Sequence, residues 1–190
     1  MKLLFATANV NKAKEIAALL PEKYSLLTLK DIDLQEDIPE TSDTLEGNAQ
    51  QKSNYVVTHF GLDCFADDTG LEVLALDKAP GVYSARYAGA ERSDEKNMDL
   101  LLRNLQGQED RSARFRTVIS LHLNGETHLF EGIVKGIIRT EKRGINGFGY
   151  DPLFEPESCG KTFAEMELDE KNKFSHRALA FRQMIGFLSK

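Results

Sequence analysis

Two adjacent carboxylates, Asp67 and Asp68, interrupt an apolar run near the middle of the chain. Residues 62–66 are apolar apart from one aspartate, and a second apolar run, 71–74, follows Thr69-Gly70. Neighbouring carboxylates at the end of a buried strand are unfavourable, because like charges in a low-dielectric setting raise each other's pKa. A bound divalent cation or polyphosphate would offset that cost. The pair therefore indicates a functional site, and an ordinary acidic turn with Gly70 at positive φ is the alternative.

A second candidate site is the junction between a predicted strand, 3–7, and the helix that follows it. The junction reads Thr7-Ala8-Asn9-Val10-Asn11-Lys12. A helix N-terminus offers backbone N–H groups and the positive end of the helix dipole, so it can bind phosphate. Thr7 and Asn9 could add hydrogen bonds, and Lys12 a positive charge. The alternative is that Asn9 only caps the helix and Lys12 is solvated; without a Walker A run the junction is not a P-loop.

A third candidate is the glycine-flanked segment Gly147-Phe148-Gly149-Tyr150-Asp151-Pro152. The two glycines would let the backbone approach a ligand closely. Phe148 could stack on a planar base, while backbone amides beside it could read the edge of that base. A purely structural glycine loop is the alternative.

The last candidate combines Lys171 with the start of the C-terminal helix. Ser175 is a predicted N-cap, so His176 and Arg177 would lie in the first turn, where positive charge opposes the helix dipole. Cations in that unfavourable position indicate an anion or a base nearby. Lys52, on a predicted long helix, shares a face with Asn48, and a solvated side chain is the default interpretation.

Apolar periodicity predicts a mixed α/β protein that positions these segments. Asp43 and Glu46 resemble a capping box for the long helix, which Gly61 would end. Asn124-Gly125 is a strong hairpin turn between two alternating segments, so the sheet is not purely parallel. We expect helices from the junction at 7–12 to residue 20, at about 43–60, from an N-cap at Ser93 to 105, and at 175–188, and strands at 3–7, 24–29, 62–66, from 71, 113–123 and 127–139.

Composition limits the class of protein. The 190 residues suit one domain, or one domain with two lobes, and the formal net charge of −6 argues against a nucleic-acid or membrane-surface binder. No apolar stretch approaches the roughly 18 residues that a membrane span needs. Cys64 and Cys159 lie far apart without metal-ligand spacing, so both are expected to be reduced in a cytoplasmic protein.

Taken together, six segments in order resemble the inosine triphosphate pyrophosphatase family, which hydrolyses non-standard purine nucleoside triphosphates. The resemblance covers nearly the whole chain, with Ala8 where the family usually has glycine and Ser53 where it has alanine. It implies an α/β fold with a mixed elongated sheet, flanking helices and two lobes around a central nucleotide-binding cleft, as a single domain 1–190. It also implies a homodimer that depends on Mg²⁺. The segments are 7–12, 46–52, 66–71, 80–87, 147–152 and 175–177.

The resemblance further implies individual roles. Asp68 would be the catalytic proton acceptor and a Mg²⁺ ligand, and Glu40 would be a second metal ligand, with Glu36 as its rival. Thr7, Asn9 and Lys12 would hold the triphosphate, with help from Lys52. The segment from Phe148 to Asp151, together with Lys171, His176 and Arg177, would bind the base and its 6-oxo group. The implied substrate-binding residues are Thr7, Ala8, Asn9, Lys12, Lys52, Thr69, Phe148, Gly149, Tyr150, Asp151, Lys171, His176 and Arg177.

The expected reaction is hydrolysis between the α- and β-phosphates of ITP, dITP or XTP, which cleanses the nucleotide pool. The products would be the nucleoside monophosphate and pyrophosphate. Two alternatives stay open: a related pyrophosphatase of the septum-formation-inhibitor type that prefers pyrimidines, and a non-catalytic nucleotide-binding regulator.

Overall fold

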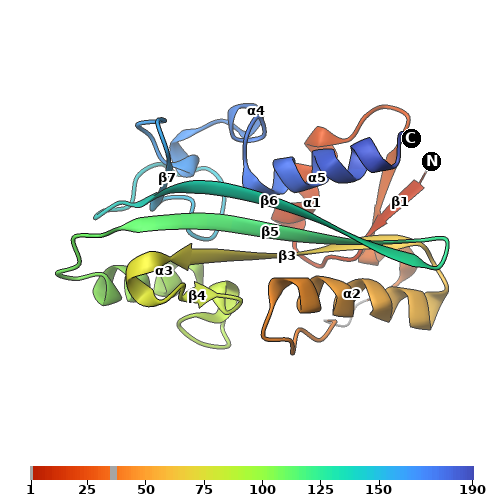
Figure 1. Ribbon diagram of the computed structural model, residues 1–190, viewed down its shortest axis with the longest axis horizontal. Coiled ribbons are helices and arrows are strands. Elements are labelled where there is room, and N and C mark those ends of the chain that lie inside the picture. Colours follow the sequence, from red (N-terminus) through yellow and green to blue (C-terminus); the bar gives the residue numbers. More distant parts are fainter. Residues whose placement is uncertain (1, 35–37) are drawn as a thin grey trace. The chain divides into compact units, whose positions relative to one another are not determined.

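The computed structural model describes residues 2–34 and 38–190, and it contains both strands and helices (Figure 1). The strands are β1 (Lys2–Phe5), β2 (Ser25–Thr28), β3 (Cys64–Val73), β4 (Pro80–Gly81), β5 (Ser112–Leu123), β6 (Glu126–Ile138) and β7 (Phe154–Pro156). The α-helices are α1 (Val10–Leu19), α2 (Leu45–Phe60), α3 (Asp94–Asn104), α4 (Leu168–Lys171) and α5 (His176–Phe187). Short 3-10 helices lie at Leu29–Ile32, Leu74–Leu76, Ser84–Arg86 and Phe163–Glu165.

Within the described residues the strands form one mixed sheet of seven strands, as predicted. The order is β2-β1-β3-β5-β6-β7, and β4 pairs with β3. β1 runs parallel to both β2 and β3, whereas β4 and β7 pair antiparallel with β3 and β6. Asn124 and Gly125, both at positive φ, form the predicted two-residue turn between β5 and β6. β3 therefore lies inside the sheet, with a neighbour on each side.

The predicted helix ends are confirmed where a short-range cap decides them. Asn9 caps α1, Ser93 caps α3, and Gly61 ends α2 in the left-handed conformation. The start of α2 was predicted wrongly at Asp43: Thr44 is the N-cap, and its hydroxyl accepts a hydrogen bond from the amide of Gly47. Thr44 has the extended backbone that an N-cap requires, so the first helical residue is Leu45.

The acidic turn predicted after residue 66 is wrong, because β3 runs without interruption from Cys64 to Val73. Asp67 and Asp68 are buried within this strand, and Gly70 does not have the positive φ that the turn required. Two carboxylates inside a central strand need partners from other elements. Because Asp67 and Asp68 are adjacent in the strand, their side chains point to opposite faces of the sheet, and their partners lie on those two faces.

The chain divides into two compact units, and three strands contribute residues to both. Unit 1 comprises Met1–Asp68, Thr117–Gly132 and Arg177–Lys190, and unit 2 comprises Thr69–Arg116 and Ile133–His176. The predicted single domain with two lobes stays a prediction. In the part of the chain that the structure describes, no helix is both long and apolar enough to cross a bilayer.

In unit 1, helices cover both faces of the sheet (Figure 1). Phe5 and Phe65 pack with Ile16 of α1 and Phe181 of α5 on one face. The alternate residues of the same strands pack with Val56 of α2 on the other face. Because successive strand side chains point to opposite faces, Asp67 is directed to the α1/α5 face and Asp68 to the α2 face.

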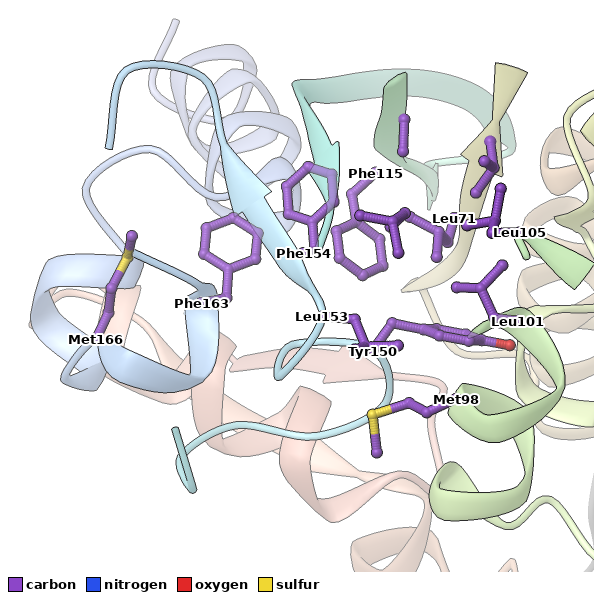
Figure 2. Packing of buried hydrophobic residues seen from close by; sticks show 13 residues of the cluster. Leu71, Met98, Leu101, Leu105, Phe115, Tyr150, Leu153, Phe154, Phe163 and Met166 are labelled. Atoms are coloured by element: carbon purple, nitrogen blue, oxygen red, sulfur yellow. The ribbon is translucent and has the colours of Figure 1, made fainter. Parts of the chain in front are cut away.

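Unit 2 has an aromatic core of its own. Figure 2 shows Phe115, Phe154 and Phe163 grouped together, with Tyr150 beside Leu101 of α3. The Phe115 and Phe154 ring centroids are 4.7 Å apart in an edge-to-face arrangement. This core supports the segment 147–151, because Tyr150 is itself one of its members.

Candidate active site

On the α1/α5 face of unit 1, Asp67 is enclosed by two cations. Its Oδ1 lies 2.9 Å from Nζ of Lys12, and its Oδ2 lies 3.1 Å from Nε of Arg177. Arg177 also pairs with Glu15 of α1. Burial alone would raise the pKa of Asp67, but Lys12 and Arg177 bring it well below its usual range. Asp67 is therefore a firmly ionised carboxylate that holds α1, β3 and α5 together.

On the α2 face, Asp68 has weaker support. Nδ2 of Asn48 donates to its Oδ2 at 3.0 Å, and Nζ of Lys52 lies 3.9 Å from its Oδ1. The orientation of the Asn48 amide is fixed, because its oxygen accepts from the backbone N–H of Ser42 at 2.9 Å. Burial, together with the nearby charge of Glu40, raises the pKa of Asp68 although Lys52 and Asn48 oppose that rise. A buried carboxylate with a raised pKa is suited to accept a proton.

Lys52 is buried and paired, so the default interpretation of a solvated lysine is wrong. Its side chain is 9% exposed, and its ammonium contacts both Glu40 and Asp68. Although burial lowers the pKa of Lys52, the carboxylates of Asp68 and Glu40 outweigh that effect and raise it. Lys52 is thus a stable cation beside the carboxylates of Glu40 and Asp68.

The predicted phosphate junction is a capped helix start with a partly buried cation, Lys12. Oδ1 of Asn9 accepts from the amides of Asn11 and Lys12 at 2.9 and 3.1 Å, and Oγ1 of Thr7 accepts from the amide of Asn9 at 3.1 Å. Two amides that a phosphate could bind are thus bonded to Asn9. Ala8 and Asn9 are exposed, whereas burial lowers the pKa of Lys12. Phosphate binding by Thr7, Ala8 and Asn9 stays a prediction.

The residues predicted to hold Mg²⁺ offer suitable donors. Glu40 and Asp68 both contact the ammonium of Lys52, so two carboxylates converge on one position that attracts positive charge. Mg²⁺ is commonly held by one or two carboxylates together with substrate phosphates and water. Among residues 2–34 and 38–190, no group of three or more His, Cys, Asp or Glu side chains could hold a metal. The donor set therefore fits a metal shared with a nucleotide; Glu36, the rival ligand, lies outside the described residues.

In unit 2, the segment 147–151 surrounds a buried ion pair. Oδ2 of Asp151 accepts from Nζ of Lys171 at 2.6 Å and from the amide of Phe148 at 2.9 Å. Nζ of Lys171 lies 5.3 Å from the centre of the Phe148 ring, a cation–π contact. Gly147 has φ 76°, and a Cβ there would lie 2.0 Å from Oδ2 of Asp151. Glycine at this position is thus required by both the backbone and the carboxylate.

Two backbone amides of this segment, which are predicted from the sequence to bind the edge of a base, have partners within the protein. The amide of Phe148 bonds to Asp151, and the amide of Gly149 donates to Oδ2 of Asp94 at 2.7 Å. Both amides hold the loop in shape. Tyr150 is a core residue whose hydroxyl donates to the carbonyl of Ser84 at 2.9 Å, and burial raises its pKa.

His176 and Arg177 are neighbours in sequence but belong to different units. The ring of His176 stacks on Phe115 with centroids 4.6 Å apart in unit 2. Arg177 belongs to unit 1, where its contacts are with Asp67 and Glu15. Asp67 and Glu15 are therefore among the anions that compensate for the unfavourable positive charge of Arg177 in the first turn of α5. The contact of Arg177 with the base stays a prediction. Thr69, also a predicted substrate-binding residue, is the first residue of unit 2.

Sequence reasoning assigns no site role to three residues that hold the candidate groups. Glu15 follows Lys12 by three positions on one helix face, so helical spacing could have indicated it, whereas Asn48 is noted only for sharing a face with Lys52. Asp94, which contacts Gly149 from a distant helix, had no local signal.

The chain matches proteins of known family along almost its whole length. The sequence model of the Ham1 family matches residues 3–187. A dITP/XTP pyrophosphatase of Christiangramia forsetii is 57% identical over 100% of both chains, and one of Flavobacterium johnsoniae is 54% identical over 100% of this chain and 98% of its own. The Staphylococcus aureus Ham1 protein superposes with a TM-score of 0.90 at 38% identity, covering 100% of this chain and 98% of its own. This chain is therefore a member of the Ham1 family.

Proposed function

We propose that this protein is a Mg²⁺-dependent pyrophosphatase that converts dITP, XTP and ITP to the nucleoside monophosphate and pyrophosphate. The observation that carries the proposal is Asp68, a buried carboxylate with a raised pKa, anchored by Asn48 and adjacent to the Lys52 ammonium. Relatives more than half identical over the full chain bear the name dITP/XTP pyrophosphatase, which supports this substrate class.

In the proposed reaction, Asp68 accepts a proton from the attacking water as the oxygen forms its bond to the α-phosphorus. The bond from the α-phosphorus to the bridging oxygen breaks, and pyrophosphate leaves with the bonding electrons. Lys12 and Lys52 lie on the two faces of β3 beside the carboxylate pair, where their charges would stabilise the triphosphate. Mg²⁺ held by Asp68 and Glu40 would neutralise charge that develops on the phosphate oxygens.

We assign binding of the purine base to the segment 147–151 and Lys171 in unit 2. The ring of Phe148 supplies a stacking surface, and Lys171 supplies a positively charged donor for a 6-oxo group. Adenine presents a 6-amino donor at that position, and each buried polar group left unpaired costs about 1–3 kcal/mol. ATP should therefore be turned over about 5- to 150-fold less efficiently than ITP.

A substrate panel tests the proposal. Pyrophosphate release would be measured with ITP, dITP, XTP, GTP, ATP and dTTP, each with Mg²⁺ and with EDTA. We expect Mg²⁺-dependent turnover that is fastest with the deaminated purines. Faster turnover of dTTP would instead assign the protein to the pyrimidine-preferring septum-formation-inhibitor type, and tight binding without turnover would make it a regulator.

The homodimer and the cytoplasmic location are also proposals. Both Cys64 and Cys159 are free thiols, which suits a reducing compartment. Sedimentation equilibrium of the purified chain would test the dimer, and a mass equal to one chain would reject it. The substrate is proposed to be a small nucleotide, with neither nucleic acid nor a membrane as partner.

A further inference from the structure

Asp94 contacts the proposed base-binding loop from an element far away in sequence. Its Oδ2 accepts a hydrogen bond from the amide of Gly149 at 2.7 Å, and both residues belong to unit 2. Asp94 is the first residue of α3, but Ser93 is the cap of that helix, since the Ser93 hydroxyl accepts from the amide of Lys96. Helix capping therefore does not account for the side chain of Asp94.

The hydrogen bond of Asp94 completes a pair of restraints on Phe148. The amide of Phe148 is held by Asp151, and the next amide along the chain, that of Gly149, is held by Asp94. These two N–H groups belong to the peptide planes on either side of Phe148. When both planes are fixed, the direction of the Cα–Cβ bond of Phe148 is fixed as well, and from this direction the ring reaches its contact with Lys171.

Packing does not replace the restraint at Gly149. This residue has φ 64°, and a Cβ built there would have no heavy atom within 4 Å. Gly149 is thus in a conformation that glycine adopts readily but also leaves readily. A hydrogen bond to a carboxylate oxygen at 2.7 Å can hold this conformation.

We propose that Asp94 is a positioning residue for purine binding. By holding the amide of Gly149, it fixes the backbone that carries Phe148 and so helps to orient the ring. This role rests on the proposed function of the loop as the base site. A pre-shaped loop saves the cost of ordering when substrate binds. Asp94 should consequently affect the Michaelis constant much more than the rate of the chemical step.

Three variants separate this role from a general effect on α3. Asp94→Ala removes the acceptor, whereas Asp94→Asn keeps a side-chain oxygen that can accept the same bond. Glu95→Gln is the matched control, because Glu95 is the next residue in the first turn and its partner is Lys142 rather than an amide of the loop. Both acidic residues interact favourably with the helix dipole, so a purely helical role would give similar results at the two positions.

For ITP hydrolysis we expect Asp94→Ala to raise KM by roughly 5- to 20-fold and to leave kcat within about twofold. Asp94→Asn should recover part of the loss, and Glu95→Gln should keep the wild-type KM. Hydrogen exchange of a peptide spanning 148–150 should be faster in Asp94→Ala than in Glu95→Gln. An unchanged or lowered KM in Asp94→Ala, with normal wild-type turnover, would overturn the positioning role alone. Absence of nucleotide hydrolysis by the wild-type protein would instead reject the proposed function.

Discussion

Replacing Asp67 and Asp68 one at a time by asparagine should have opposite consequences, although the two residues are neighbours in one strand. Asp67 lies between Lys12 and Arg177, with its side chain 1% exposed. Removing one partner of a buried ion pair costs about 3–5 kcal/mol. Because Arg177 keeps Glu15, we expect the lower end, about 3 kcal/mol, for Asp67→Asn. In a chain of 190 residues this should lower the midpoint of thermal unfolding by roughly 6–12 °C.

Asp68→Asn should keep or raise stability while it abolishes most turnover. Burial raises the pKa of Asp68, so its ionised form is disfavoured in the folded protein. The amide removes that penalty but cannot accept a proton. Loss of a general base costs about 10²- to 10⁴-fold in rate, so kcat should fall by that amount. Such a gain in stability with a loss of activity is common for residues of functional sites.

The pH dependence of unfolding provides an independent check on the two variants. The pKa of Asp67 is lower in the folded than in the unfolded chain, so its contribution is present above about pH 4 and is lost as pH falls toward the folded pKa. The deficit of Asp67→Asn should therefore shrink in acid. For Asp68 the sign is reversed, and the advantage of Asp68→Asn should grow as pH rises above about 4.

Thermal denaturation between about pH 3 and 8, with pyrophosphate release from ITP, would measure all of these effects. A wild-type unfolding midpoint for Asp67→Asn, together with a lowered one for Asp68→Asn, would refute the assignment of the buried ion pairs. Wild-type turnover by Asp68→Asn would refute its role as proton acceptor.

Three further predictions concern single residues. Gly147→Ala forces a Cβ against the carboxylate of Asp151 at positive φ, so calorimetry should show a loss of at least about 1–2 kcal/mol, and no loss would contradict the described loop. Lys171→Met removes the ammonium from buried Asp151; chemical denaturation should show a loss of about 3–5 kcal/mol, and ITP should bind more weakly. Burial raises the pKa of the Cys64 thiol to about 12, so iodoacetamide at about pH 8 should label only Cys159 until the chain is unfolded, and mass spectrometry would reveal early labelling of Cys64.

Features that depend on near neighbours in sequence were predictable. Ser93 is a predicted helix cap, and Asn9 is one in the alternative interpretation of its junction, because a cap needs only a side-chain oxygen two or three residues before the amide that it binds. The Asn124-Gly125 turn follows from the positive φ that those two residues tolerate. The start of α2 was missed by one position, because Asp43 and Thr44 are both suitable caps and only the backbone conformation selects Thr44.

Contacts between distant segments decided what the sequence pattern could not. The carboxylate pair indicates a site, but the sequence predicts a turn for two charges in an apolar run, since the cations that hold Asp67 within the strand come from residues 55 and 110 positions away. Once β3 is continuous, the alternation of its side chains sends Asp67 toward α1 and α5 and Asp68 toward α2. The sequence by itself therefore determined the family, the mixed sheet and the residues that carry charge. Only the tertiary structure decided that one carboxylate is locked between two cations while its neighbour keeps a raised pKa, because partners across the fold set the electrostatics of each face.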